Sequence, residues 1–181
     1  MKWLIRIVGA FGGLLIIAVV ILLALGARTD ANRLQASVTI RRGPDAVWPY
    51  LYEPEKLKSW VTWLKKVESD REGPPAVGAH AVWVMEDMNN GGAIMRINSE
   101  VEAVEPNRRL AVKLSAAEGF DGTAVYSLTD LGGGATRLEC DSRYTFHNAF
   151  AKLLSPLIFP SARKKMLGDM DRLRASLEKG Q

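Results

Sequence analysis

The chain of 181 residues has few of the residue types that carry catalysis or bind metals. Its single cysteine, Cys140, excludes an intramolecular disulfide and a cysteine-based zinc site. It has two histidines, His80 and His147, and it lacks the spacings of a zinc protease, a serine hydrolase or a phosphate-binding loop. The sequence therefore predicts no catalytic residue, no metal ion and no cofactor.

A basic surface for nucleic acid is also missing from the body of the chain. The formal net charge is +4, but Lys2 and Arg6 contribute +2 and residues 161–181 contribute +3, which leaves −1 for residues 28–160. Aromatic residues are not interleaved with Arg or Lys as a base-stacking surface requires. No nucleic acid partner is expected.

One long hydrophobic run stands at the N-terminus. Residues 7–25 form an uncharged, strongly apolar stretch of 19 residues, which nearly spans a hydrocarbon core of ~30 Å as a helix. Lys2 and Arg6 before it favour a cytoplasmic N-terminus and a domain on the extracytoplasmic side. We predict a single-pass membrane anchor at residues 1–27, although the arginines that follow it, Arg28, Arg33, Arg41 and Arg42, weaken the orientation.

Two alternatives concern the same segment. A cleaved signal peptide is the competing interpretation, because Ala24 and Gly26 are small residues that suit a cut, but the apolar run is longer than usual for such peptides. Gly9 and Gly13 form a GxxxG pair that fits a weak homodimer contact, whereas glycine that is merely tolerated in a membrane helix gives the same pattern.

The remaining chain changes from short helices to strands and back to one helix. After a linker at residues 28–35, residues 36–42 predict a strand, and Pro44 and Pro54 begin two short helices that end near Trp60. Residues 65–78 are interpreted as a loop. Between residues 79 and 146, five β-rich runs separated by turn residues predict an antiparallel meander, with breaks at residues 89–92, 105–108, 118–122 and 130–134.

The last predicted strand and the following helix are expected to face each other. Alternate residues from Thr136 to Phe146 are apolar or small, while those between them are charged, so one face of the sheet should be covered. Residues 148–178 show helical spacing in two apolar sets separated by Pro156, Pro160 and a basic run. We expect a kinked or broken first half, a straighter second half from about Ser161, and packing of this helix on the sheet.

Four stretches carry a resemblance to a known family. They are VTIRRGPDAVWPYL at 38–51, EPEKL at 53–57 with Trp60, VEPNRRL at 104–110 and GGATRL at 133–138. With the order of elements, residues 36–178 resemble the START-like, or SRPBCC, superfamily, in particular its polyketide cyclase/dehydrase-type members. The resemblance implies an α+β helix-grip fold: a curved antiparallel sheet of about six strands around a long C-terminal helix, with residues 179–181 as a tail.

The resemblance also implies a hydrophobic cavity between sheet and helix that holds a lipid-like or aromatic small molecule. On this basis the expected cavity lining consists of Trp83, Met85, Met95, Ile97, Val112, Leu114, Tyr126, Leu138, Cys140, Tyr144, Phe146, Leu157, Met166, Met170 and Leu173. The flexible methionines suit an adaptable pocket and equally suit ordinary core filling. Tyrosine offers an apolar body with a hydroxyl that seeks a partner.

Other polar residues are assigned more conservatively. His147 is expected to cap the helix or to be exposed, and the side on which His80 lies is left open. Glu86, Arg96 and Asn98 either line the cavity or lie on a solvated outer face, which is the favoured interpretation. Cys140 is interpreted as a small buried hydrophobe and not as a reactive thiol.

Three functions follow as hypotheses. The first is a membrane-anchored binding or carrier domain for a hydrophobic small molecule or lipid, with residues 149–160 as a mobile lid. The second is an enzyme of cyclase or dehydratase type, which requires polar side chains to meet in the cavity. The third is a protein-interaction module at the membrane with a filled core.

Overall fold

The computed structural model describes residues 17–22, 24, 32–88, 91–117 and 119–179. Most of the predicted membrane segment, Gly9 and Gly13 included, lies outside these residues. Within them, no helix combines the length and the apolar character needed to cross a membrane. The anchor, its orientation and the glycine contact therefore remain predictions.

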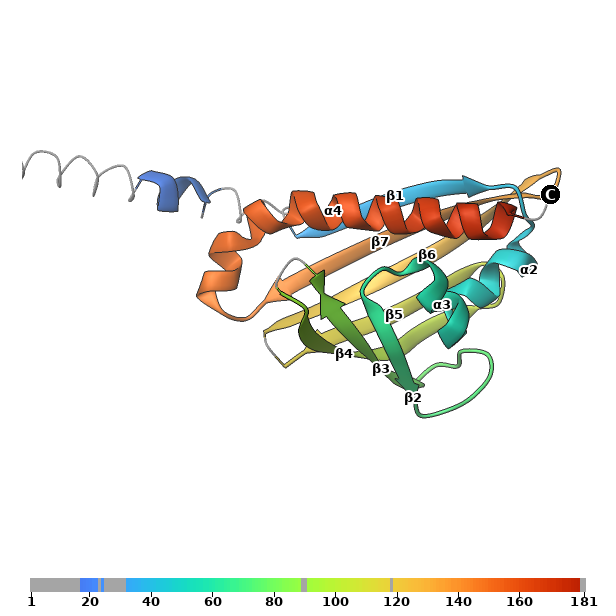
Figure 1. Ribbon diagram of the computed structural model, residues 1–181, viewed down its shortest axis with the longest axis horizontal. Coiled ribbons are helices and arrows are strands. Elements are labelled where there is room, and N and C mark those ends of the chain that lie inside the picture. The colour runs from blue at the N-terminus through green and yellow to red at the C-terminus, as the bar shows by residue number, and fades with distance from the viewer. Residues whose placement is uncertain (1–16, 23, 25–31, 89–90, 118, 180–181) are drawn as a thin grey trace, which may run out of the picture.

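The domain consists of one sheet, three short helical segments and one long helix (Figure 1). The helices are α2 (Pro44–Val47), the 3-10 helix η1 (Trp48–Leu51), α3 (Pro54–Trp60) and α4 (Ala149–Glu178). The strands are β1 (Arg33–Ile40), β2 (Leu64–Ser69), β3 (His80–Asp87), β4 (Ala93–Glu105), β5 (Arg109–Ala116), β6 (Phe120–Gly132) and β7 (Ala135–Phe146). Pro44 and Pro54 occupy the first helical positions, where their missing N–H costs nothing.

All seven strands are antiparallel, in the order β1-β7-β6-β5-β4-β3-β2. The meander from β2 to β7 runs in sequence order, and β1 joins it by pairing with β7. The curved sheet and the long C-terminal helix confirm the helix-grip expectation.

Alternation along β7 confirms the predicted covered face. Thr136, Leu138, Cys140 and Ser142 are buried, whereas Arg137, between them, is exposed. The C-terminal half of α4 lies along β1 on this face (Figure 1). Met170, Leu173 and Leu177 of α4 join β1, β7 and α3 side chains in one hydrophobic core.

Helix α4 is kinked in its first half but not broken. Asn148 caps it, because its side-chain oxygen accepts a hydrogen bond from the Ala151 amide at 2.6 Å. The helix continues through Pro156 and Pro160, and its first turns bend away from the axis of the rest (Figure 1). Proline removes a helical hydrogen bond without ending the helix here.

The expected number of strands was too small by one. Residues 65–78 were interpreted as a loop, but β2 occupies the start of that segment and pairs with β3. Charged side chains dominate β2 and form ion pairs on the outer face, Lys65 with Glu86 and Glu68 with Arg96. Such charges are common on edge strands, where they discourage pairing with other chains.

Two other boundaries differ from the prediction. The first strand begins at Arg33, three residues earlier than expected. The Arg33 side chain forms an ion pair with Asp141 of β7. The turn between β5 and β6 ends before Phe120, so that Gly122 lies within β6 and pairs with Tyr144. Phe120 thereby becomes a residue of the sheet.

Candidate functional site

A cavity of about 680 Å³ lies between the inner face of the sheet and the kinked part of α4. Side chains from β1, β3, β4, β6, β7, α3, α4 and the segment after α3 form its walls. Most are apolar or aromatic. The lining residues are Leu34, Trp60, Val61, Trp63, Trp83, Met85, Asp87, Met95, Ile97, Phe120, Tyr126, Cys140, Tyr144, Phe146, Leu157, Ile158, Phe159, Ser161, Ala162, Lys165, Met166, Asp169 and Met170.

Four aromatic rings in contact with one another form part of the cavity wall. Phe120 of β6 packs edge-on against Tyr144 and Phe146 of β7, with ring centroids 5.6 and 6.4 Å apart. The Phe159 ring of α4 contacts both Tyr144 and Phe146, with ring centroids 6.1 Å apart in each pair. Edge-to-face packing of this kind adds about 0.5–1.5 kcal/mol per pair beyond burial. The quartet therefore fixes the kinked part of α4 to the sheet through one side chain.

Gly122 makes room for the Tyr144 ring. A Cβ atom at Gly122 would lie 2.7 Å from the Arg143 carbonyl oxygen and 2.9 Å from a Tyr144 ring carbon. Both distances are shorter than a methyl group tolerates. The glycine, which resembles a turn residue in the sequence, is thus required inside the strand.

Phenol and thiol groups form the polar part of the cavity floor. Burial raises the pKa of Tyr144 to about 12 and that of the Cys140 thiol to about 11. Burial also raises the pKa of Tyr126 well above its usual value, with the neighbouring Cys140 as the next cause. All three groups are therefore protonated at neutral pH. This supports the interpretation of Cys140 as a buried hydrophobe, since the thiolate is the reactive form.

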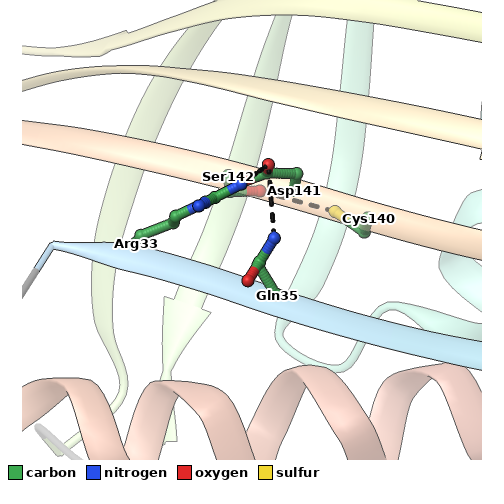
Figure 2. A network of polar contacts seen from close by, with 5 residues as sticks. All are labelled: Arg33, Gln35, Cys140, Asp141 and Ser142. Carbon is green, nitrogen blue, oxygen red and sulfur yellow. Dashed lines mark hydrogen bonds and ion pairs between the residues drawn. The ribbon is translucent and has the colours of Figure 1, made fainter. Parts of the chain in front are cut away.

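The strand that carries Cys140 is held in place from its other face. Figure 2 shows Arg33 and Gln35 of β1 both reaching Asp141 of β7, while the Cys140 sulfur points toward Ser142. Arg33 Nε donates to an Asp141 carboxylate oxygen at 2.8 Å, and this guanidinium lowers the pKa of Asp141. The Cys140 sulfur and the Ser142 hydroxyl oxygen are 3.4 Å apart.

A charged cluster forms the wall on the α4 side. The buried Asp169 carboxylate accepts hydrogen bonds from the Thr62 amide at 3.1 Å, the Thr62 hydroxyl at 2.6 Å and Lys165 Nζ at 2.6 Å. Lys165 Nζ also lies 4.9 Å from the Trp63 ring centroid, a cation–π distance. These contacts connect α4 to the segment that follows α3.

Trp63 adopts a backbone conformation that bulky residues rarely take. Its φ is +75°, which costs on the order of 1–3 kcal/mol. The Trp63 carbonyl accepts a hydrogen bond from the Glu86 amide at 2.8 Å. This contact with β3 and the Lys165 ammonium hold the indole in the cavity wall.

The rim of the cavity carries exposed apolar side chains. Leu157 and Ile158 line the cavity and are 62% and 51% exposed, and Phe150, near the start of the same helix, is 70% exposed. Met88 and Ile94, at the β3–β4 connection, are also exposed, next to the lining residues of the same hairpin. The kinked half of α4 is therefore the open side of the cavity.

The structure brings most of the predicted lining residues together in this cavity. They are Trp83, Met85, Met95, Ile97, Tyr126, Cys140, Tyr144, Phe146, Leu157, Met166 and Met170. The other four lie elsewhere. Val112 lines a second cavity, Leu114 packs against the core, and Leu138 and Leu173 are fully buried within it.

The second cavity, of about 410 Å³, lies beneath α3 and the β2–β3 connection. Its walls include Leu57, Val67, Val101, Leu110 and Val112, and the charged residues Arg71 and Glu72 also line it. Trp83 lines this cavity as well as the first.

Several lining residues were not predicted, chiefly Trp63, Phe120, Phe159, Lys165 and Asp169. Lys165 and Asp169 directly precede Met166 and Met170, so the spacing that placed the methionines inside also indicates these two positions. The prediction placed Lys165 in the basic run between the two apolar sets, and it left both charged residues out of the expected lining. Phe120 was assigned to a turn that the structure places in β6.

The remaining candidate polar residues lie away from the first cavity, although His80 lines the second one. His147 is exposed, with Nε2 2.8 Å from an Asp121 carboxylate oxygen, and Asn148 provides the helix cap instead. His80 is exposed at the start of β3. Glu86 and Arg96 form the outer-face ion pairs described above. No group of acidic, cysteine or histidine side chains in the described part of the chain is arranged to hold a metal ion.

Comparison with known proteins agrees with this architecture. A family described as "Polyketide cyclase / dehydrase and lipid transport" matches residues 32–178. No curated protein matches the chain.

Solved structures share the fold at low sequence identity. A conserved protein of Geobacillus kaustophilus aligns with TM-score 0.67 at 14% identity, over 81% of this chain and 95% of that chain. The Zhui aromatase/cyclase of Streptomyces sp. R1128 aligns with TM-score 0.66 at 16% identity, over 81% and 93%. A Thermus thermophilus protein aligns with TM-score 0.65 at 20% identity, over 80% and 96%. With the family match over residues 32–178, this chain belongs to the polyketide cyclase/dehydrase and lipid transport family of the SRPBCC superfamily.

Proposed function

We propose that this protein is a membrane-tethered binding and carrier domain for a hydrophobic small molecule or lipid. The observation that carries the proposal is the cavity of about 680 Å³ with aromatic and methionine walls. Its volume lies within the range of roughly 300–1,000 Å³ for ligand sites, which are mostly apolar with few polar anchors. Tyr126, Tyr144 and Lys165 provide such anchors.

The open side of the cavity suits exchange with a bilayer. β1 and α4 start at the same end of the domain (Figure 1). At the opposite end, Arg42, just after β1, donates a hydrogen bond to the Leu177 carbonyl of α4 at 3.0 Å. Residues 26–32 connect the apolar run at residues 7–25 to β1 and extend over at most about 25 Å. An anchor at residues 7–25 would keep the exposed Phe150, Leu157 and Ile158 close to the membrane.

Basic side chains on α4 also support an arrangement in which the first half of this helix faces the membrane. Lys152, Arg163 and Lys164 are exposed on α4. Each basic side chain near an anionic membrane surface contributes about 1 kcal/mol of attraction. Apolar side chains and these charges together suit contact with anionic headgroups.

A transfer assay tests the carrier function. The full chain is reconstituted in nanodiscs of phosphatidylcholine with phosphatidylglycerol, and movement of a fluorescent fatty acid to acceptor vesicles is followed. Ala162→Trp places an indole in the cavity, whereas Ala175→Trp places one on the exposed side of the same helix. We expect Ala162→Trp to reduce transfer at least tenfold and Ala175→Trp to leave it unchanged. Equal transfer by all three proteins would contradict the proposal.

The tether has a separate test. We expect the full chain to sediment with membranes and to resist carbonate extraction, and a chain that starts at residue 28 to stay in the supernatant. A mature protein whose measured mass shows a cut near Ala24 and Gly26 would support the signal-peptide alternative instead.

A second candidate, an enzyme of cyclase or dehydratase type, is favoured by one specific observation. Tyr126, Cys140, Lys165 and Asp169 all line the cavity, so the polar side chains that this hypothesis requires do meet there. Protonated Tyr126 and the Lys165 ammonium are proton donors suited to an enolate or carbonyl oxygen. Incubation with a thioester-bound poly-β-ketone and mass spectrometry test it: loss of water that Tyr126→Phe reduces supports an enzyme, and an unchanged mass contradicts it.

A further inference from the structure

Two cavities on the inner face of the sheet share one side chain. In the described part of the chain, Trp83 is the one residue that lines both the first cavity, beneath α4, and the second cavity, beneath α3. It is partly buried. The indole therefore has free space on two sides.

Strand pairing places Trp83 on the boundary between the cavities. β3 lies between β2 and β4, and Trp83 pairs directly with Val67 on one side and Ile97 on the other. Val67 lines the second cavity and Ile97 lines the first. The row across the three strands thus passes from one cavity to the other at Trp83.

Helix α3 forms the opposite side of the same boundary. Leu57 lines the second cavity, and Trp60, three residues later on the same face of the helix, lines the first. Trp60 is fixed, because its indole N–H donates to the Tyr50 carbonyl at 2.9 Å. The wall consequently has a fixed side on α3 and a single large side chain, Trp83, on the sheet.

We propose that Trp83 is a specificity-determining residue that sets the greatest length of the ligand's apolar chain. This inference rests on the proposed function and names the ligand class as a flexible, linear hydrocarbon chain with a polar head. The chain enters beside Leu157 and Ile158, and its far end stops against the Trp83 indole. The second cavity, which has apolar walls, is the space that the indole withholds.

The length dependence follows from the burial of methylene groups. Each added carbon that enters the first cavity strengthens binding about fourfold. A carbon added after the chain reaches Trp83 finds no apolar space and gives no further gain. Affinity therefore rises with chain length up to a break.

The test measures binding of a homologous series of straight-chain fatty alcohols to the full chain in nanodiscs. Discs that carry Ala162→Trp, with the first cavity filled, supply the background from partitioning into the bilayer. We expect a break in the wild-type series, and we expect Trp83→Ala to move the break several carbons longer. Trp83→Phe, with a smaller ring, should move the break less, and it keeps the test decisive if the alanine variant does not fold.

Two control variants test whether the position of the break depends on Trp83 or only on the size of the first cavity. Met95→Ala enlarges the first cavity only, so it should change affinity without moving the break. Val101→Trp fills the second cavity and should restore the wild-type break when combined with Trp83→Ala.

Two results would overturn the inference in distinguishable ways. Alcohols that bind above background with the same break in wild type, Trp83→Ala and Trp83→Phe would refute the role of Trp83 and leave the proposed function standing. Alcohols that bind no better than in the Ala162→Trp discs would refute both.

Discussion

The two halves of α4 belong to one helix but differ in how deeply their apolar side chains are buried and in what these side chains contact. In the second half, Met170 and Leu173 are 2% and 0% exposed and belong to the central core. In the first half, Phe150 and Leu157 are 70% and 62% exposed, and Phe159 makes the aromatic contacts with the sheet. Apolar residues at helical spacing thus stabilise the fold at one end and border an open cavity at the other.

The largest expected effect separates these roles by stability. Leu173→Ala should lower the free energy of unfolding by about 2–5 kcal/mol, because it leaves a cavity in packed core. Leu157→Ala should change it by no more than about 0.5 kcal/mol, since the side chain is mostly exposed. Urea denaturation of the full chain in detergent measures both. Similar losses for the two leucines would show that the first half also supports the core.

Alkaline pH tests how well water is excluded from the cavity floor that β6 and β7 provide beneath α4. The pKa of Cys140 is raised from 9.0 to about 11, so its contribution to stability is complete below pH 9 and is lost as the pH rises through 11. The loss is on the order of 2 kcal/mol. Denaturation between pH 8 and 11 should show a steeper decline for wild type than for Cys140→Ala. Parallel curves would indicate a hydrated floor.

Hydrogen exchange compares the halves directly. We expect amides at residues 151–159 to exchange at least tenfold faster than those at 169–177, equivalent to about 1.4 kcal/mol in opening free energy. The two prolines and the exposed apolar side chains leave the first half with fewer stabilising contacts. Equal protection, measured on the full chain by mass spectrometry, would contradict a mobile lid.

The smallest effect is at Gly168, in the second half of α4. Gly168 is exposed in the helix, and a Cβ atom there meets nothing within 4 Å. Gly168→Ala should therefore stabilise the protein by about 0.5–1 kcal/mol through helix propensity. Ala175→Gly, also at an exposed helical position, should destabilise by a similar amount. A loss of stability on Gly168→Ala would show that the glycine allows motion that the fold requires.

The fold followed from the sequence wherever periodicity was strong. Helical spacing predicted that α4 packs on the sheet through Met166, Met170, Leu173 and Leu177. Alternation in β7 predicted which face of the sheet the helix covers. β2 was missed because Lys65, Lys66 and Glu68 obscure alternation on an edge strand. Gly122 was assigned to a turn because the sequence does not reveal that the Tyr144 ring occupies the space of its side chain.

Only part of the candidate site could be predicted from the periodicity of the sequence. Alternation identifies the face of a strand but not the depth along it, so Leu138, in the core, was grouped with Tyr144, in the cavity. Lys165 and Asp169 face inward because they satisfy each other and Thr62, which is a relation between segments distant in sequence. Trp83 was correctly placed on the inner face, but its position between two cavities depends on α3.

The pairing of β1 with β7 has a consequence for the order of events during synthesis. The hydrogen bond from Arg33 to Asp141 spans 108 positions, so β1 obtains its neighbour in the sheet only after β7 has left the ribosome. Until then β1 has no edge to join, and α4, which packs along β1, is still being made. The domain must therefore close after β7 and α4 have been made rather than grow from β1 onward, and contacts of such long sequence separation make that closure slow.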